Sequence, residues 1–206
     1  MQWLHKSLLS CAAAVLVLMP ATSAVQAAGK KAVATFGAGC FWCTESDYDK
    51  VPGVLATVSG FMGGHVKNPT YKQVVRGNTG HTEVVQITYD PSKVSYKKLV
   101  EYYWRHVDMF DKGGQFCDRG GQYRPAIFVH SAQQAATAKK SRDAIDNSGQ
   151  FRQKIVVEIT PAAAFTAAEN YHQNFYKKNP AHYHRYRIGC GRDQRIKRIW
   201  GAAAKS

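Results

Sequence analysis

The 206-residue sequence has few acidic residues, few cysteines and no repeat or low-complexity run. It contains 14 Asp and Glu against 28 Lys and Arg, so the net charge is +14, and such a field attracts anionic surfaces or partners. Because 45% of the residues are hydrophobic, the sequence does not have the composition of a disordered chain. It also lacks the glycine at every third position that marks a collagen-like chain. The sequence therefore predicts a packed globular protein, and its length suits one domain.

The apolar run near the N-terminus, residues 8–19, is too short to span a bilayer. It follows Lys6 and is broken by Pro20, and Val25 and Ala27 offer small side chains at the two positions that a signal peptidase reads. We therefore expect a cleavable signal peptide over residues 1–27 and a periplasmic or secreted protein without stable membrane insertion.

Removal of the signal leaves a single domain over residues 28–206 with a net charge of +13, because only Lys6 is lost. A lipoprotein signal at Cys11 is disfavoured, since the apolar run follows that cysteine instead of preceding it. Residues 179–206 are basic and rich in aromatic side chains, and we expect them to form a long irregular C-terminal tail.

Short β-branched runs alternate with longer amphipathic stretches along the chain. The expected strands are residues 32–36, 54–59, 83–89, 126–130 and 155–160. The expected helices are residues 41–49, 70–76, 96–106, 132–147 and 166–178. Because strands and helices interleave, we expect an α+β fold, an α/β two-layer sandwich in which helices cover a mixed sheet. Residues 107–124 are expected to form a long functional loop.

Four cysteines remain after the signal: Cys40, Cys43, Cys117 and Cys190. An even number in an exported protein is consistent with structural disulfides, whereas the three-residue spacing of the first two favours redox or metal chemistry. Zinc is disfavoured because there is no second close pair of ligands, and haem attachment is disfavoured because Thr44 stands where a histidine is needed. We expect no metal and no cofactor.

Cys40 lies where a glycine-flanked turn leads from an expected strand into an expected helix. Unpaired N–H groups and the positive end of a helix dipole favour thiolate over thiol, and the thiolate is the nucleophilic form. Phe41 and Trp42 could then line an apolar pocket. The alternative is equally open: both aromatic residues belong to the core, and Cys40 and Cys43 form a local disulfide.

Glu83 begins a strand whose alternation places it on the same face as Val85 and Ile87. A carboxyl group that loses water there is protonated more easily, which suits a proton donor near neutral pH. The phenols of Tyr71 and Tyr123 can donate hydrogen bonds to an oxygen that gains negative charge. The alternatives are a solvent-facing carboxylate and tyrosines that only pack.

Five motifs occur in order along residues 32–178. They are GCFW at 39–42, NPTY at 68–71, TGHTE at 79–83, YDP at 89–91 and QYR at 122–124. In this order they resemble the A-type peptide methionine sulfoxide reductases. The resemblance implies thiol-dependent reduction of methionine S-sulfoxide, free or in peptides and proteins, on a two-layer fold with a ferredoxin-like core.

The resemblance also implies a role for each matching residue. These are Cys40 as nucleophile, Glu83 as the acid, Tyr71 and Tyr123 as donors to the sulfoxide oxygen, Phe41 and Trp42 around the methyl group, and Asp118 on the polar side of the site. A thiolate attacks the sulfoxide sulfur while the departing oxygen needs a proton. The product is a sulfenic acid on Cys40, which a second thiol converts to a disulfide and a thioredoxin-like dithiol resets.

The sequence departs from the family pattern at the cysteines. The family often has Gly where Cys43 stands and Gly-Asn where Phe116-Cys117 stands, so the resolving thiol is ambiguous. We rank Cys190 first, because it lies between glycines in the tail, Cys43 second and Cys117 third.

Two other functions fit parts of the sequence. A thioredoxin-like disulfide oxidoreductase would use Cys40 and Cys43 alone. A basic binding module would use the tail, although an exported protein rarely meets nucleic acid, so none is expected as a partner. The default oligomeric state is a monomer.

Overall fold

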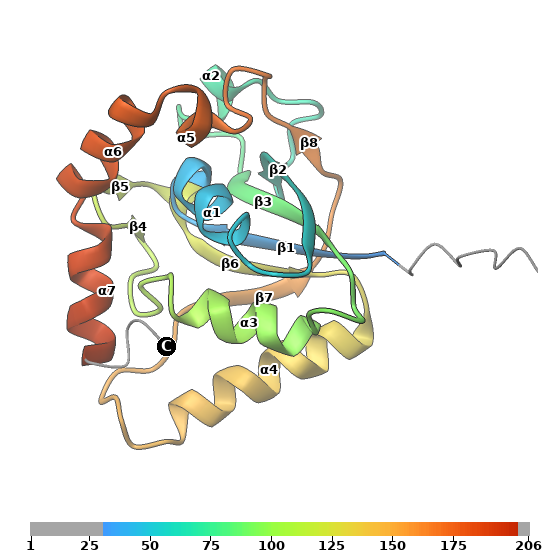
Figure 1. Cartoon of the computed structure of the whole chain (residues 1–206), viewed down its shortest axis with the longest axis vertical. Coiled ribbons are helices and arrows are strands. Elements are labelled where there is room, and N and C mark those ends of the chain that lie inside the picture. The colour runs from blue at the N-terminus through green and yellow to red at the C-terminus, as the bar shows by residue number, and fades with distance from the viewer. Residues whose placement is uncertain (1–30, 202–206) are drawn as a thin grey trace, which may run out of the picture.

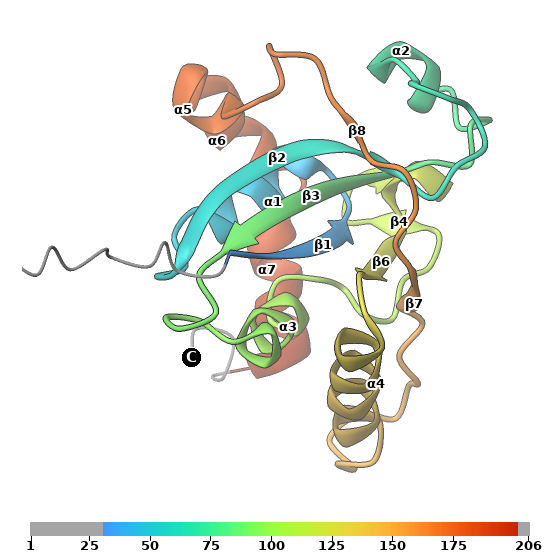
Figure 2. The same ribbon diagram turned by 90° about the vertical axis from the view of Figure 1, so that its right-hand side faces the viewer.

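The computed structural model describes residues 31–201 and is shown from two sides (Figures 1 and 2). The expected signal peptide and Cys11 lie outside the described residues. Among residues 31–201, no helix is both long enough and apolar enough to cross a membrane.

A six-stranded sheet forms the centre of the fold, in the order β7-β6-β1-β3-β2-β8. Its strands are β1 (Ala32–Ala38), β2 (Val54–Met62), β3 (Thr82–Tyr89), β6 (Pro125–Val129), β7 (Glu158–Pro161) and β8 (Thr166–Ala167). The β6–β7 pair is parallel and the other pairs are antiparallel, so the sheet is mixed, as predicted. A separate hairpin pairs β4 (Gly114–Gln115) with β5 (Asp118–Arg119).

Seven α-helices and one short 3₁₀ helix occur in residues 31–201. They are α1 (Phe41–Tyr48), α2 (Tyr71–Val74), α3 (Tyr96–Trp104), η1 (Gly121–Tyr123), α4 (Ala132–Asp146), α5 (Phe175–Lys178), α6 (Pro180–Gly189) and α7 (Arg192–Trp200). Hydroxyl caps begin three of them: Thr70, Ser95 and Ser131 each accept from the backbone N–H three residues on. The first four α-helices lie within the stretches where the sequence predicted helices.

The main core lies between one face of the sheet and the helices α1 and α3. Phe36 of β1 stacks on Tyr48 of α1 and on Tyr103 of α3, each with ring centroids 5.2 Å apart. All three rings are fully buried, and Figure 1 shows α1 in front of the sheet. The other face of the sheet carries a smaller cluster that includes Met62 and Phe128. The two-layer prediction is therefore confirmed.

The predicted helix over residues 166–178 is wrong except for its last turn, Phe175–Lys178. Thr166 and Ala167 pair with Phe61 and Gly60 of β2, so this segment extends the sheet as β8. A left-handed residue, Asn174, precedes the single helical turn of α5. The opportunity to pair with the edge strand outweighed the local helical pattern, as tertiary contacts often do.

The predicted irregular tail over residues 179–206 is also wrong, because most of it forms α6 and α7. Pro180 occupies the first turn of α6, where its missing N–H costs nothing. Gly191 adopts φ +67°, which separates the two helices. Trp200 is buried in α7 and its Nε1–H donates to the Trp104 carbonyl over 3.0 Å.

The predicted loop over residues 107–124 is only partly irregular, because it includes the β4–β5 hairpin and η1. The buried side chain of Gln115 hydrogen-bonds the backbone of Asp108 within this segment. Its Nε2–H donates to the Asp108 carbonyl and its Oε1 accepts from the Asp108 N–H, both over 2.8 Å. The segment therefore has a fixed shape.

Candidate active site

Cys40 is the N-cap residue of α1, at the turn that follows β1. Gly39 has φ +79°, and a Cβ there would lie 2.5 Å from Gln115 Cβ, so only glycine fits this turn. Two carboxyl groups accept from the first N–H groups of the helix. Glu83 Oε2 accepts from the Phe41 N–H over 3.1 Å, and Asp118 accepts from the Cys40 N–H. The helix N-terminus thus brings Cys40, Glu83 and Asp118 together.

Glu83 lies on the buried face of β3, as strand alternation predicted, and only 1% of it is exposed. Burial raises the pKa of its carboxyl group to about 8, although the hydrogen bond from the Phe41 N–H acts in the opposite direction. At neutral pH this side chain is mostly protonated. It is therefore a proton donor next to the nucleophile.

The two thiols at the start of α1 are both buried, with Cys40 6% and Cys43 1% exposed. Burial raises the pKa of Cys40 well above its ordinary value, and Cys43, Glu83 and Asp118 add to the effect. In this state, burial and the neighbouring Cys43 therefore oppose the thiolate that the helix N-terminus favours. The hydrogen bond from Cys40 lowers the pKa of Cys43 to about 7.

The two predicted tyrosines converge on the same place from α2 and η1. Burial raises the pKa of both phenols, and the charges of Glu83 and Cys40 add to the shift in each case. Tyr71 is held by its N–H, which donates to Glu169 over 3.0 Å. Tyr71 and Tyr123 therefore stay protonated and can donate hydrogen bonds to an oxygen near Cys40.

Aromatic rings form one wall of the site. Trp42 stacks on Phe175 with ring centroids 3.7 Å apart, and its Nε1–H donates to His172 Nδ1 over 3.0 Å. Phe41 is 1% exposed and lies with its ring 6.1 Å from that of Tyr71. The wall is apolar and fixed, which suits a methyl group.

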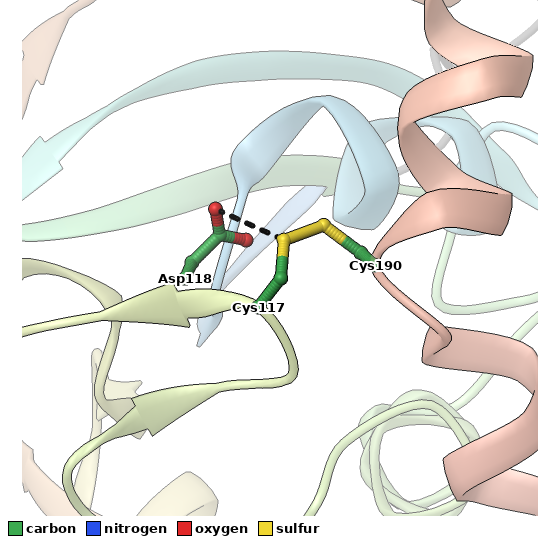
Figure 3. A group of neighbouring side chains, drawn as sticks. All are labelled: Cys117, Asp118 and Cys190. Atoms are coloured by element: carbon green, nitrogen blue, oxygen red, sulfur yellow. Dashed lines mark hydrogen bonds between the residues drawn. A yellow bond between two sulfur atoms is a disulfide. The ribbon is translucent and has the colours of Figure 1, made fainter.

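A disulfide joins Cys117, in the turn of the β4–β5 hairpin, to Cys190 at the end of α6 (Figure 3). The two Cα atoms are 4.8 Å apart although the residues are 73 positions apart in sequence. Asp118 follows Cys117 and its Oδ1 lies 3.8 Å from the Cys117 sulfur. Cys117 is exposed and Cys190 is half-buried, unlike the thiols of α1.

Within residues 31–201, one group of three potential metal ligands lies within 4.8 Å, namely Cys117, Asp118 and Cys190. Two of its three ligand atoms are joined in the disulfide, which leaves only the carboxylate free to bind. Because structural zinc sites use four thiolate or imidazole ligands, these residues do not fit one in this redox state.

Sequence analysis missed three residues that contact the predicted site. His172 orients Trp42, Tyr186 donates to Asp118 Oδ2 over 2.5 Å, and Arg192 donates to the Ala38 carbonyl over 2.6 Å just before the Cys40 turn. Two of them lie in the stretch predicted to be irregular. A helical reading of that stretch would have placed Tyr186 one turn before Cys190 and shown the connection.

Comparison with known proteins agrees with this geometry. A family model described as "Peptide methionine sulfoxide reductase" matches residues 32–204. The chain is 51% identical over 173 residues to a Bacillus subtilis protein named "Peptide methionine sulfoxide reductase MsrA", covering 84% of this chain and 98% of that one.

Two solved structures are similar. Methionine sulfoxide reductase A of Corynebacterium diphtheriae is 34% identical, with a TM-score of 0.64 over 73% of this chain and 76% of that chain. Mxr1 from Saccharomyces cerevisiae in reduced form is 31% identical, with a TM-score of 0.68 over 74% of this chain and 87% of that chain. The chain therefore belongs to the peptide methionine sulfoxide reductase family.

Proposed function

We propose that this enzyme reduces methionine sulfoxide, free or in peptides and proteins, to methionine, and that it acts on the S epimer. The observation that carries the proposal is a buried, mostly protonated carboxyl group, Glu83, beside a buried cysteine on the same helix N-terminus. A sulfoxide needs both groups at once, because its sulfur is attacked while its oxygen accepts a proton.

Each residue of the site has its own role in this reaction. Cys40, as thiolate, attacks the sulfoxide sulfur, and Glu83 gives its proton to the sulfoxide oxygen. Tyr71 and Tyr123 donate hydrogen bonds to that oxygen, and the Phe41–Trp42 wall holds the methyl group. The attack forms an S–S bond between Cys40 and the sulfoxide sulfur, and the protonated oxygen then leaves as hydroxide. Hydroxide attacks the Cys40 sulfur, which breaks the S–S bond, releases methionine and leaves a sulfenic acid on Cys40.

The neighbouring carboxyl groups also control the nucleophile. An ionised Glu83 raises the pKa of Cys40, so a proton on Glu83 makes the thiolate less costly. The productive state therefore pairs a neutral acid with a charged nucleophile. This pairing explains why the site needs a buried carboxyl group instead of a solvated one.

Resolution of the sulfenic acid involves Cys43 first, in this geometry. Cys43 lies one helical turn from Cys40 within hydrogen-bonding distance, and its pKa of about 7 provides thiolate at neutral pH. Its attack on the sulfenic acid forms the Cys40–Cys43 disulfide and releases water. The sequence ranked Cys190 ahead of Cys43; we propose the reverse order, because Cys190 is engaged with Cys117 in this state.

The exposed Cys117–Cys190 pair then reduces the buried pair. As a dithiol, it can undergo thiol–disulfide exchange with the Cys40–Cys43 disulfide, which restores the thiols of Cys40 and Cys43 and gives the state seen here. A thioredoxin-like dithiol can reach exposed Cys117 but not the buried pair.

Fully reduced enzyme without external reductant is therefore expected to release two methionines per chain. Each pair of thiols supplies two electrons when it becomes a disulfide, and each sulfoxide consumes two. Replacement of both Cys117 and Cys190 by serine should reduce the yield to one. The measurement is quenched-flow methionine release with peptide mapping, and a yield of one in the unaltered enzyme would contradict transfer between the pairs.

The assay that tests the function uses the two epimers separately. With dithiothreitol as reductant, the enzyme is expected to convert a peptide methionine S-sulfoxide and leave the R-sulfoxide unchanged, as resolved by chiral chromatography. Equal conversion of both epimers, or of neither, would refute the proposal.

We also propose export to the periplasm or beyond the cell, on the basis of the apolar run at residues 8–19. Cell fractionation should place the protein outside the cytoplasm with residues 1–27 removed. Intact, cytoplasmic protein would contradict this.

A further inference from the structure

Two neighbouring connections join the end of α6 to the β4–β5 hairpin. Cys190, the C-cap residue of α6, forms the disulfide with Cys117. Tyr186, one helical turn earlier, donates its hydroxyl hydrogen bond to Asp118 Oδ2 over 2.5 Å. Cys117 and Asp118 are consecutive and lie side by side (Figure 3). The covalent bond therefore fixes the partners of the hydrogen bond, because both connect the same two segments.

Tyr186 also reaches the nucleophile. Its hydroxyl is within hydrogen-bonding distance of the Cys40 thiol, and its ring packs edge-on against Trp42 at 5.8 Å between centroids. Asp118, its other partner, accepts from the Cys40 N–H. Tyr186 thus touches the thiol, the aromatic wall and the carboxylate that caps the nucleophile.

A phenol has a single proton to donate. The short contact with Asp118 uses that proton, so Tyr186 has none left to stabilise a thiolate on Cys40. The same hydrogen bond stabilises the charge on Asp118, which disfavours a second negative charge on Cys40.

We propose that Tyr186 is a positioning residue of this active site, and that the closed Cys117–Cys190 disulfide holds its hydroxyl against Asp118, where it slows the reactions of Cys40. The inference rests on the proposed function, since it concerns the same nucleophile. When a dithiol donor breaks the S–S bond, it becomes a disulfide and the enzyme gains two electrons and two protons as two thiols. Tyr186 then loses its covalent restraint, and Cys40 reacts faster than in the closed state.

Other charged or titratable groups face the start of α1 from every element around it. They are Cys43 on α1, Glu83 on β3, Asp118 on β5, Tyr71 on α2, Tyr123 on η1, Tyr186 on α6 and Arg192 on α7. Arg192 follows the disulfide in sequence but is held separately by the Ala38 and His106 carbonyls. Asp118 and Tyr186 are the pair that the disulfide restrains directly.

The test measures how fast iodoacetamide alkylates Cys40 across pH, by peptide mapping. Cys43→Ser provides the background, because Cys40 is then the single thiol in its segment. In protein with the disulfide closed, Tyr186→Phe should lower the apparent pKa of Cys40 by about one unit and raise its alkylation rate at pH 7 about tenfold. After Cys117→Ser and Cys190→Ser are added, the same change should alter the rate less than about twofold.

The control variant is Tyr176→Phe. Tyr176 lies on α5, and the substitution removes a phenol that donates to Asp49 Oδ2 over 2.6 Å. It should leave the alkylation profile of Cys40 unchanged. An unchanged profile in Tyr186→Phe would overturn the positioning role, and an equal effect with and without the disulfide would overturn its redox control. Because alkylation needs no sulfoxide, an enzyme inactive toward methionine sulfoxide that shows the Tyr186 effect would refute the proposed function alone.

Discussion

Replacement of Glu83 by glutamine is expected to lower the rate of the first turnover by about 10² to 10⁴-fold, the usual contribution of a general acid. Glutamine keeps the size of the side chain, and its oxygen can still accept from the Phe41 N–H. It cannot transfer a proton to the departing oxygen. The measurement is single-turnover methionine release by reduced enzyme, so that recycling does not contribute.

The pH dependence of the unaltered enzyme is a second test of the role of Glu83 as the acid. Glu83 acts in its protonated form, and its raised pKa of about 8 keeps that form present through neutral pH. The single-turnover rate should therefore fall as pH rises through about 8. In Glu83→Gln this alkaline fall should disappear, because no proton is left to lose at that position.

Glu45→Gln is the matched control for this change. Glu45 lies on α1, the helix whose first N–H donates to Glu83; it is fully buried and accepts from the Asn174 N–H over 2.9 Å. Burial raises its pKa to about 7, so it resembles Glu83 in environment but not in position. Glu45→Gln should change the first turnover less than about threefold. A comparable loss in both variants would mean that Glu83 supports the fold of α1 instead of donating a proton.

The parts of the site that sequence predicted correctly are those governed by short-range pattern. Strand alternation placed Glu83 on the buried face of β3, and the glycine-flanked turn placed Cys40 at the start of α1. Both depend only on residues within one element and its turn. The ordered motifs then brought Tyr71 and Tyr123 to the same place through resemblance.

The parts that sequence missed depend on contacts between distant segments. Two contacts determine the structure after residue 165: the pairing of β8 with β2 and the hydrogen bond from Trp200 to the Trp104 carbonyl. Neither can be read from local periodicity. Treating residues 179–206 as irregular concealed the helical turn between Tyr186 and Cys190. The electrostatics of Cys40 were missed for the same reason, because Asp118 comes from a hairpin 78 positions away in sequence.

Replacement of Cys40 by serine should have the largest effect of any single substitution. A serine hydroxyl in this buried site, beside two carboxyl groups, cannot supply a charged nucleophile at neutral pH. The rate of methionine release should fall by roughly 10⁴-fold or more, the scale of losing a catalytic nucleophile.

The informative comparison is with Cys43→Ser, which removes the second thiol of the same helical turn. That variant should still release one methionine per chain at a near-normal rate and accumulate a sulfenic acid on Cys40, detectable by dimedone labelling, because attack precedes resolution. Cys40→Ser should give neither product. If Cys40→Ser released methionine while Cys43→Ser did not, the roles of the two thiols would be reversed. The buried pair would then act through Cys43, whose pKa near 7 makes it the more acidic thiol of the two in this state.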